Sequence, residues 1–349
     1  MNAGSLLIVG FEGKVAPPGL LERIAARRVG GVVLFARNLG TLDEICALTS
    51  LLQAAVPAGD PPLWLSIDQE GGRVQRIRAP LSVWPPMQQV GSQADEEFSR
   101  AVGAAVGAEL APLGFNVDYA PVLDVHTNPD NPIIGDRAFR TDAASAATHA
   151  IAFWRGLESA GVRGCGKHFP GHGDTATDSH LTLPHVDHDE ARLRAVELEP
   201  FRRAIAAGMP MLMTAHVVYP AIDARPATMS TRWLTEILRL ELGFRGVVVS
   251  DDLDMKAVAD EFPVEQTVVE SLLAGCDSFL ACRDPEIQQR AEAALDEAAR
   301  HDAQVKARLV ESLARVHAFR TTLVRTPVAA AAALALVGGH VALVKRARG

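Results

Sequence analysis

The sequence is poor in cysteine and has no excess of positive charge. Its 349 residues include four scattered cysteines, Cys46, Cys165, Cys276 and Cys282, and no CxxC pair. This excludes a disulfide framework and predicts buried free thiols in a reducing, cytoplasmic compartment. The 34 basic and 42 acidic residues give a formal charge of −8. A protein that gathers phosphates needs the opposite sign, so we expect no nucleic-acid partner.

A secretion signal and a clear membrane span are also missing. Residues 6–11 are apolar, but no basic residue precedes them and no small-residue cleavage site follows, so we interpret them as a strand. The Ala-rich stretch 328–344 is shorter than the about 18–20 continuous apolar residues of a span and is interrupted at 338–340. We therefore expect no membrane span but a terminal helix packed on the body, whose basic end at 345–348 leaves an interfacial role open.

What the sequence does contain is an alternation of short apolar runs and longer amphipathic segments. Eight runs are predicted strands, at 6–11, 31–35, 63–67, 115–119, 163–168, 211–215, 246–250 and 277–281. The segments of helical length lie at 20–28, 42–55, 94–113, 143–160, 190–207, 231–242, 264–274 and 285–300. Eight strand–helix units predict an α/β fold, specifically a (β/α)8 TIM-type barrel.

A doubly wound parallel sheet is the alternative architecture. It usually carries a GxGxxG turn after its first strand, and Gly10, Gly13 and Gly19 lack that spacing. No linker or change in composition divides the chain before about residue 300. We therefore predict a (β/α)8 catalytic domain over 1–300, followed by a C-terminal helical extension and tail over 301–349.

Polar residues follow several of the predicted strands, where barrel enzymes place their active sites. They are DQEGGR at 68–73, Lys167 and His168, His216, and the pair Asp251 and Asp252. An aspartate after a strand is often only a helix N-cap, and an arginine is often only a solvated surface charge. The grouping of these residues at one end of the barrel nevertheless favours a functional site there.

The segment KHFPGHGDTATDSH at 167–180 permits two interpretations. Metal binding would use nitrogen and oxygen ligands from His168, His172, His180, Asp174 and Asp178. The spacing shows neither HxH nor a helical HxxxH, and the ammonium of Lys167 would oppose a cation, so we expect no metal. Two further histidines downstream, His185 and His188, are predicted to be exposed or structural.

The second interpretation is acid–base chemistry by Asp178 and His180. An aspartate two residues before a histidine can accept a hydrogen bond from one ring nitrogen and favour the protonated ring. The other ring nitrogen can then transfer protons. A DxH triplet alone does not establish catalysis, so both interpretations stay open on the residues by themselves.

Four motifs resemble glycoside hydrolase family 3, in particular its β-N-acetylglucosaminidase branch, the enzymes of peptidoglycan recycling. They are KHFPGHGDTATDSH at 167–180, IDQEGGRVQR at 67–76, GDRAF at 135–139 and VVSDDLDM at 248–255. The resemblance extends from about residue 5 to about residue 300 in the expected order. It implies a (β/α)8 barrel that removes terminal β-linked N-acetylglucosamine from muropeptide disaccharides or chitooligosaccharides, with retention of configuration and without a cofactor.

The resemblance also implies a role for each matching residue. Asp251 becomes the nucleophile, and His180 the general acid/base with Asp178 as its partner. Sugar binding is implied for Asp68, Arg76, Arg137, Lys167 and His168. Retention requires two displacements, and a histidine with an ordinary pKa of about 6.5 can serve as the acid in the first and the base in the second.

Several alternatives remain at this stage. One alternative is phosphorolysis, in which phosphate takes the place of water as the acceptor. Another is a β-glucosidase-type member of the family, although that branch often carries an additional domain and a tryptophan where this chain has Asp252. The Asp251–Asp252 pair resembles the carboxylates of substrate-assisted hydrolysis. A metal-dependent hydrolase and a sugar-binding barrel without turnover are the distant alternatives. We expect a monomer or weak homo-oligomer.

Overall fold

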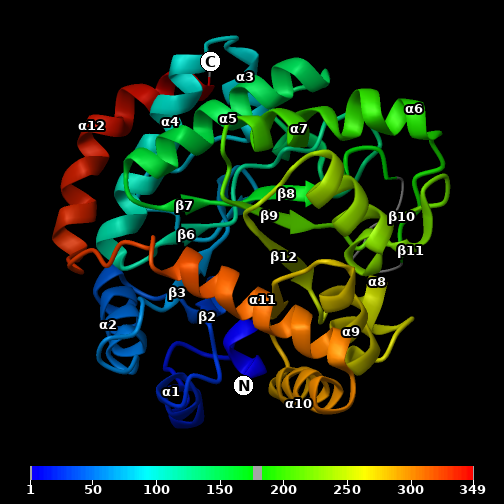
Figure 1. Ribbon diagram of the computed structural model, residues 1–349. Helices are drawn as coiled ribbons and strands as arrows, with labels where there is room; N and C mark the ends of the chain where they lie inside the picture. Colours follow the sequence, from blue (N-terminus) through cyan, green and yellow to red (C-terminus); the bar gives the residue numbers. More distant parts are fainter. Residues whose placement is uncertain (1, 176–182, 349) are drawn as a thin grey trace.

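A closed sheet of parallel strands forms the centre of the molecule in the computed structural model, which describes residues 2–175 and 183–348. The main sheet has the strand order β7-β6-β3-β2-β1-β13-β12-β9-β8, with every pair parallel. The two ends of this order, β7 (Arg163–Gly164) and β8 (Gly166–Phe169), are separated only by Cys165. The sheet therefore closes on itself as a barrel (Figure 1).

Each of the eight predicted strands is present, so the predicted (β/α)8 barrel is confirmed. The remaining strands of the barrel are β1 (Leu7–Val9), β2 (Gly31–Val33), β3 (Trp64–Ile67), β6 (Val117–Asp118), β9 (Met211–Thr214), β12 (Val247–Asp252) and β13 (Ser278–Ala281). β7 and β8 together make the predicted fifth strand. β12 extends two residues beyond its predicted end and includes Asp251 and Asp252.

Helices surround the barrel close to their predicted positions (Figure 1). They are α1 (Pro18–Ala25), α2 (Leu42–Ala54), α4 (Glu96–Leu110), α5 (Ala143–Ser159), α7 (Glu199–Ala206), α9 (Val264–Ala274) and α10 (Pro285–His301). The predicted helix at 190–207 is divided into α6 (Glu190–Arg192), a π-helical segment (Leu193–Glu197) and α7, and a second π-helical segment spans Arg232–Glu241. Shorter elements are α3 (Met87–Ser92), α8 (Lys256–Ala259) and 3-10 turns at Ala3–Leu6, Ala36–Asn38, Ala111–Leu113, Gly135–Arg137 and Ala227–Met229.

Local sequence explains why these helices form and how they pack. In α2, Thr41 accepts a hydrogen bond from the Glu44 N–H while the Glu44 side chain accepts one from the Thr41 N–H, which completes a capping box. Ile45, Leu48 and Leu52 then recur at helical spacing and are buried in the core. Each such side chain contributes about 1.5–3 kcal/mol through burial. The helix is thus specified both at its start and along its inner face.

The C-terminal extension consists of α11 (Ala303–Arg320) and α12 (Ala330–Arg348). α12 runs along the outside of α4 (Figure 1), and His340 Nδ1 lies 2.7 Å from Glu109 Oε1 of that helix. In the described part of the chain, α12 is the one helix long and apolar enough to cross a membrane by length and composition, and 17% of its most apolar stretch is buried. The predicted terminal helix is therefore present and packs on α4.

Candidate active site

A cavity of about 500 Å³ lies at the carboxyl ends of the barrel strands. Its wall includes six of the predicted site residues, namely Asp68, Arg76, Arg137, Lys167, His168 and Asp251. Lys167 and His168 come from β8 and Asp251 comes from β12, whereas the other three come from the segments that follow β3 and β6. The other two, Asp178 and His180, lie outside the described residues. The prediction that the polar motifs gather at one end of the barrel is therefore confirmed for the residues that can be placed.

A small hairpin after β3 shapes one side of the cavity. Its strands are β4 (Gln69–Gly71) and β5 (Val74–Gln75), which pair antiparallel. Gly71 and Gly72 form the turn with φ angles of 109° and 57°, a region that favours glycine, and a Cβ on Gly72 would lie 2.9 Å from the backbone of Pro86. The hairpin returns the chain so that Arg76 NH2 lies 3.0 Å from Asp68 Oδ2.

Asp68 is held between two cations. Besides Arg76, Lys167 of β8 donates to Asp68 Oδ1 over 2.8 Å, although the two residues are 99 positions apart in the sequence. Burial by itself would raise the pKa of Asp68, but the charges of Lys167 and Arg76 outweigh burial and hold that pKa below its ordinary value. Asp68 is therefore a carboxylate at neutral pH, with its two oxygens aimed at fixed donors.

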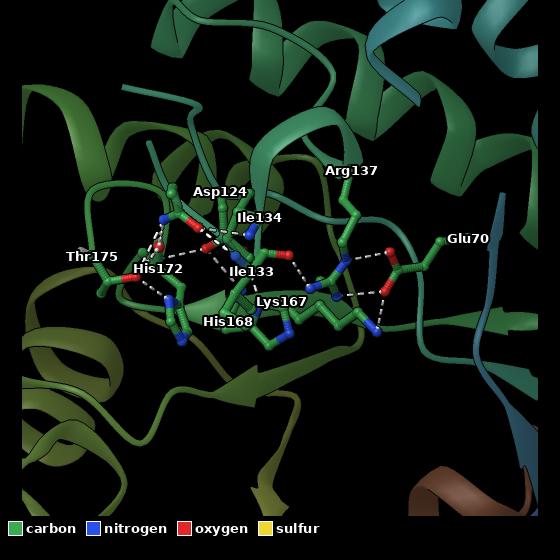
Figure 2. A network of polar contacts seen from close by, with 12 residues as sticks. Glu70, Asp124, Ile133, Ile134, Arg137, Lys167, His168, His172 and Thr175 are labelled. Carbon is green, nitrogen blue, oxygen red and sulfur yellow. Dashed lines mark hydrogen bonds and ion pairs between the residues drawn. The ribbon is translucent and has the colours of Figure 1, made fainter. Parts of the chain in front are cut away.

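Glu70 is a buried residue of this site that the sequence analysis did not assign. Its carboxylate accepts two hydrogen bonds from Arg137, of 2.8 and 2.7 Å, and its Oε1 lies 2.6 Å from Lys167 Nζ (Figure 2). Burial opposes its charge, but Arg137 and then Lys167 lower the pKa of Glu70 to about 2. The only available signal was its spacing of two from Asp68, since alternate residues of an extended chain share a face.

Asp124 orients the histidine of the same wall. Its Oδ2 lies 2.7 Å from His168 Nδ1, and its Oδ1 accepts the backbone N–H groups of His168 and His172 (Figure 2). Burial would raise the pKa of Asp124, but His168 reverses that effect and lowers it. The pair fixes which ring nitrogen of His168 faces the protein, so that Nε2 is on the side away from Asp124.

In the described part of the histidine-rich segment, His172 lies beside the His168–Asp124 pair, whereas Asp174 makes its contacts elsewhere. His172 Nδ1 lies 2.8 Å from Thr175 Oγ1, and burial followed by the charge of His168 lowers the pKa of His172 to about 4. Asp174 accepts a hydrogen bond from Thr127 and pairs with His188. His185 is exposed, as predicted. Across residues 2–175 and 183–348, no group of three or more His, Cys, Asp or Glu is arranged to hold a metal ion.

Asp251 and Asp252 both line the cavity at the end of β12. The backbone N–H of Asp252 donates to Asp251 Oδ1 over 2.8 Å. The next helix, α8, begins after Met255, which makes no side-chain cap, so neither aspartate is its N-cap. The interpretation of these residues as simple helix caps is therefore wrong, and both residues line the site.

His216, which follows β9, supports this wall from behind. The ring is buried, with Nδ1 2.9 Å from Thr228 Oγ1 and Nε2 3.2 Å from the carbonyl oxygen of Asp252. Burial lowers the pKa of His216, which keeps the ring neutral at pH 7. It is not among the residues that line the cavity, so it acts as a structural contact of β12.

Comparison with known proteins agrees with this geometry. The profile of the glycosyl hydrolase family 3 N-terminal domain matches residues 14–318. The chain is 37% identical over 349 residues to beta-hexosaminidase A of Pseudoalteromonas piscicida, covering 92% of this chain and 58% of that protein. It is 41% identical over 264 residues to the beta-hexosaminidase of Nitrosomonas eutropha, covering 74% of this chain and 75% of that protein.

A solved structure shows the same similarity in three dimensions. It is the glycoside hydrolase family 3 beta-N-acetylglucosaminidase from a Paenibacillus species, with a TM-score of 0.88 and 36% identity. The alignment covers 99% of this chain and 67% of that one. The chain thus spans little more than half the length of one curated relative and three quarters of another. The profile match and these identities show that the chain belongs to glycosyl hydrolase family 3.

Proposed function

We propose that the chain is a retaining exo-β-N-acetylglucosaminidase, which hydrolyses terminal β-linked N-acetylglucosamine from muropeptide disaccharides or chitooligosaccharides. The observation that carries this proposal is one cavity that presents Asp251 opposite a set of charged sugar-binding groups. The relatives named beta-hexosaminidase and beta-N-acetylglucosaminidase support the same substrate class. A carboxylate and an array of donors are what a retaining glycosidase needs from its protein.

One wall of the cavity supplies the groups that hold the sugar. We call it the charged wall, and it consists of Asp68, Glu70, Arg76, Arg137, Lys167 and His168. Asp68 is the acceptor for ring hydroxyls, because a carboxylate takes two donors at once. Arg76, Arg137, Lys167 and His168 are the donors. Lys167 and Arg137 are locked by Glu70, so they bind without first losing side-chain freedom. Binding energy from these contacts is then available for orienting the anomeric carbon towards Asp251.

Asp251 attacks the anomeric carbon in the proposed first step. One oxygen, Oδ1, is held by the Asp252 N–H, which leaves Oδ2 for the new bond. His180, with Asp178 as its partner, protonates the leaving oxygen. In the second step the neutral His180 takes a proton from water, which displaces the sugar from Asp251 and restores the carboxylate.

The charged wall favours water over phosphate as the acceptor. Arg76, Arg137 and Lys167 are each paired with a carboxylate of Asp68 or Glu70, so none of these three offers an uncompensated charge to an incoming anion. We propose hydrolysis on this ground. Product analysis with and without phosphate is the test, and a sugar phosphate as the main product would contradict it.

Covalent trapping tests the proposed function directly. A 2-fluoro sugar or a 5-fluoro N-acetylglucosaminide with an activated leaving group should inactivate the protein, and mass mapping should place the sugar on Asp251. A label on Asp252, or continued turnover without any adduct, would contradict the assignment. Replacing His180 by Ala should slow substrates with poor leaving groups far more than activated aryl glycosides. Equal losses on both would exclude the acid role.

We also propose a cytoplasmic protein that is a monomer or weak homo-oligomer, has no membrane span and binds no nucleic acid. The four free cysteines support the reducing compartment, and the acidic net charge supports the absence of a nucleic-acid partner. The division into a catalytic domain over 1–300 and an extension over 301–349 stays a prediction. Truncation at residue 300 is its test, and a truncated chain that folds and retains activity would support the boundary.

A further inference from the structure

Asp251 and Asp252 face one cavity although neighbouring strand residues normally point to opposite sides. In the pairing of β12 with β13, Val249 lies opposite Ser278 and Asp252 lies opposite Leu280. β12 therefore advances three residues while β13 advances two. Such an extra residue is a β-bulge, which turns the side chains beside it and is common next to active sites. The bulge places both residues at the same wall.

The side chain of Asp252 forms hydrogen bonds that connect this bulge to the turn after β12 and to the chain just beyond β13. Its Oδ1 accepts the backbone N–H of Asp254 over 3.1 Å and that of Cys282, just beyond β13, over 3.0 Å. The carbonyl of Asp252 is in contact with His216 behind the wall. Asp252 thus joins β12 to the turn that follows it, to Cys282 just beyond β13 and to His216 beyond β9. Its own N–H, held by these contacts, is the donor to Asp251 Oδ1.

Among the described residues, the groups in contact with Asp252 are acidic or neutral. Asp251 and Asp254 are its charged neighbours, with the Cys282 thiol and the neutral His216 ring beside it. Burial first, and then the charge of Asp254, raises the pKa of Asp252 to about 7. At lower pH the carboxyl is neutral, so it adds no repulsion to Asp251. An uncharged side chain that retains the acceptor oxygen would therefore reproduce its contacts.

We propose that Asp252 is a positioning residue for Asp251. Its side chain clamps the bulge so that the Asp252 N–H holds one oxygen of Asp251 and leaves the other aimed at the sugar. This inference rests on the proposed function, in which Asp251 is the nucleophile. The requirement is geometric, since a displacement of about 1 Å at a reacting group can cost about 100-fold in rate.

Two substitutions separate positioning from other roles. Asp252→Asn retains an oxygen that accepts from Asp254 and Cys282, and should keep kcat within a few fold of the unsubstituted protein below pH 7. Asp252→Ala removes the acceptor and should lower kcat and the rate of fluorosugar trapping by about 100-fold, with little change in KM. Asp284→Asn, at the exposed N-cap of α10, is the matched control and should change neither.

The pH profile supplies a readout that a purely structural role would not move. Loss of the Asp252 proton above about pH 7 places a second negative charge beside Asp251, so kcat should change with pH there, and this change should be absent in Asp252→Asn. Trapping at the normal rate in Asp252→Ala would overturn the proposal. An equal loss of kcat in Asp252→Asn and Asp252→Ala would overturn it too, because it would indicate that the carboxyl group contacts the substrate directly. Labelling of another residue in the unsubstituted protein would instead reject the proposed function.

Discussion

The two walls of the cavity use the same residue types in opposite electrostatic environments. On the wall of β3 and β8, Asp68 and Glu70 are surrounded by cations that lower their pKa values. On the wall of β12, burial and neighbouring acids raise the pKa of Asp252. The first wall thus holds its polar side chains in fixed ion pairs, which suits the sugar binding that we propose for it. Among residues 2–175 and 183–348, no Arg or Lys forms an ion pair with Asp251 or Asp252, and such a pair would weaken the proposed nucleophile.

The largest expected effect comes from removing a carboxylate from each wall in turn. Asp251→Ala should lower kcat by about 10⁴-fold or more while the substrate still binds, because the covalent step is lost. Asp68→Asn should act mainly on KM, since it weakens contacts to the sugar and to Lys167 and Arg76. Steady-state kinetics with inhibitor binding separates the two. A similar split between kcat and KM in both variants would break the comparison between the walls.

A smaller but clear effect is expected on stability when the charged wall loses Glu70. Glu70→Gln leaves Lys167 and Arg137 buried with one carboxylate fewer, which should lower the free energy of unfolding by about 3–5 kcal/mol. Denaturant unfolding measures this. Glu265→Gln is the matched control, because Glu265 makes two hydrogen bonds to Arg290 on the exposed surface, where solvent screens the pair. Equal losses in the two variants would contradict the importance of burial.

The last effect concerns the pH dependence of stability. Burial raises the pKa of Asp118 to about 8, whereas the unfolded chain has an ordinary value of about 3.9. Between these values the folded protein binds the extra proton, so stability falls as the pH rises, by up to about 1.4 kcal/mol per pH unit. Asp118→Asn, which retains the acceptor for the Gln69 N–H, should reduce this fall. An unchanged slope between pH 5 and 8 would contradict the shift.

The positions of the strands could be predicted because the barrel imposes a local pattern. Each strand is covered on both sides and is therefore apolar, and each helix repeats apolar residues on its inner face. The predicted strand at 211–215, for example, differs from β9 by one residue. Polar residues after the strands then indicated the site, because the carboxyl ends of parallel strands meet at one end of a barrel.

Glu70, Asp124 and Asp252 could not be assigned in the same way. Their roles depend on partners distant in sequence, such as Arg137 for Glu70, His168 for Asp124 and Cys282 for Asp252. The bulge in β12 is a similar case, since strand alternation alone predicts that only one of Asp251 and Asp252 faces inward. No local pattern records such a pairing.

The sequence by itself determined the family, the barrel and the end of it that carries the site. Short-range periodicity and four motifs were sufficient, because burial and chain geometry act on neighbouring residues. Only the tertiary structure decided which carboxyl group is bound by cations and which is not. That decision requires distances between strands and the burial of each group, and both arise when the sheet closes and brings β3, β8 and β12 around one cavity.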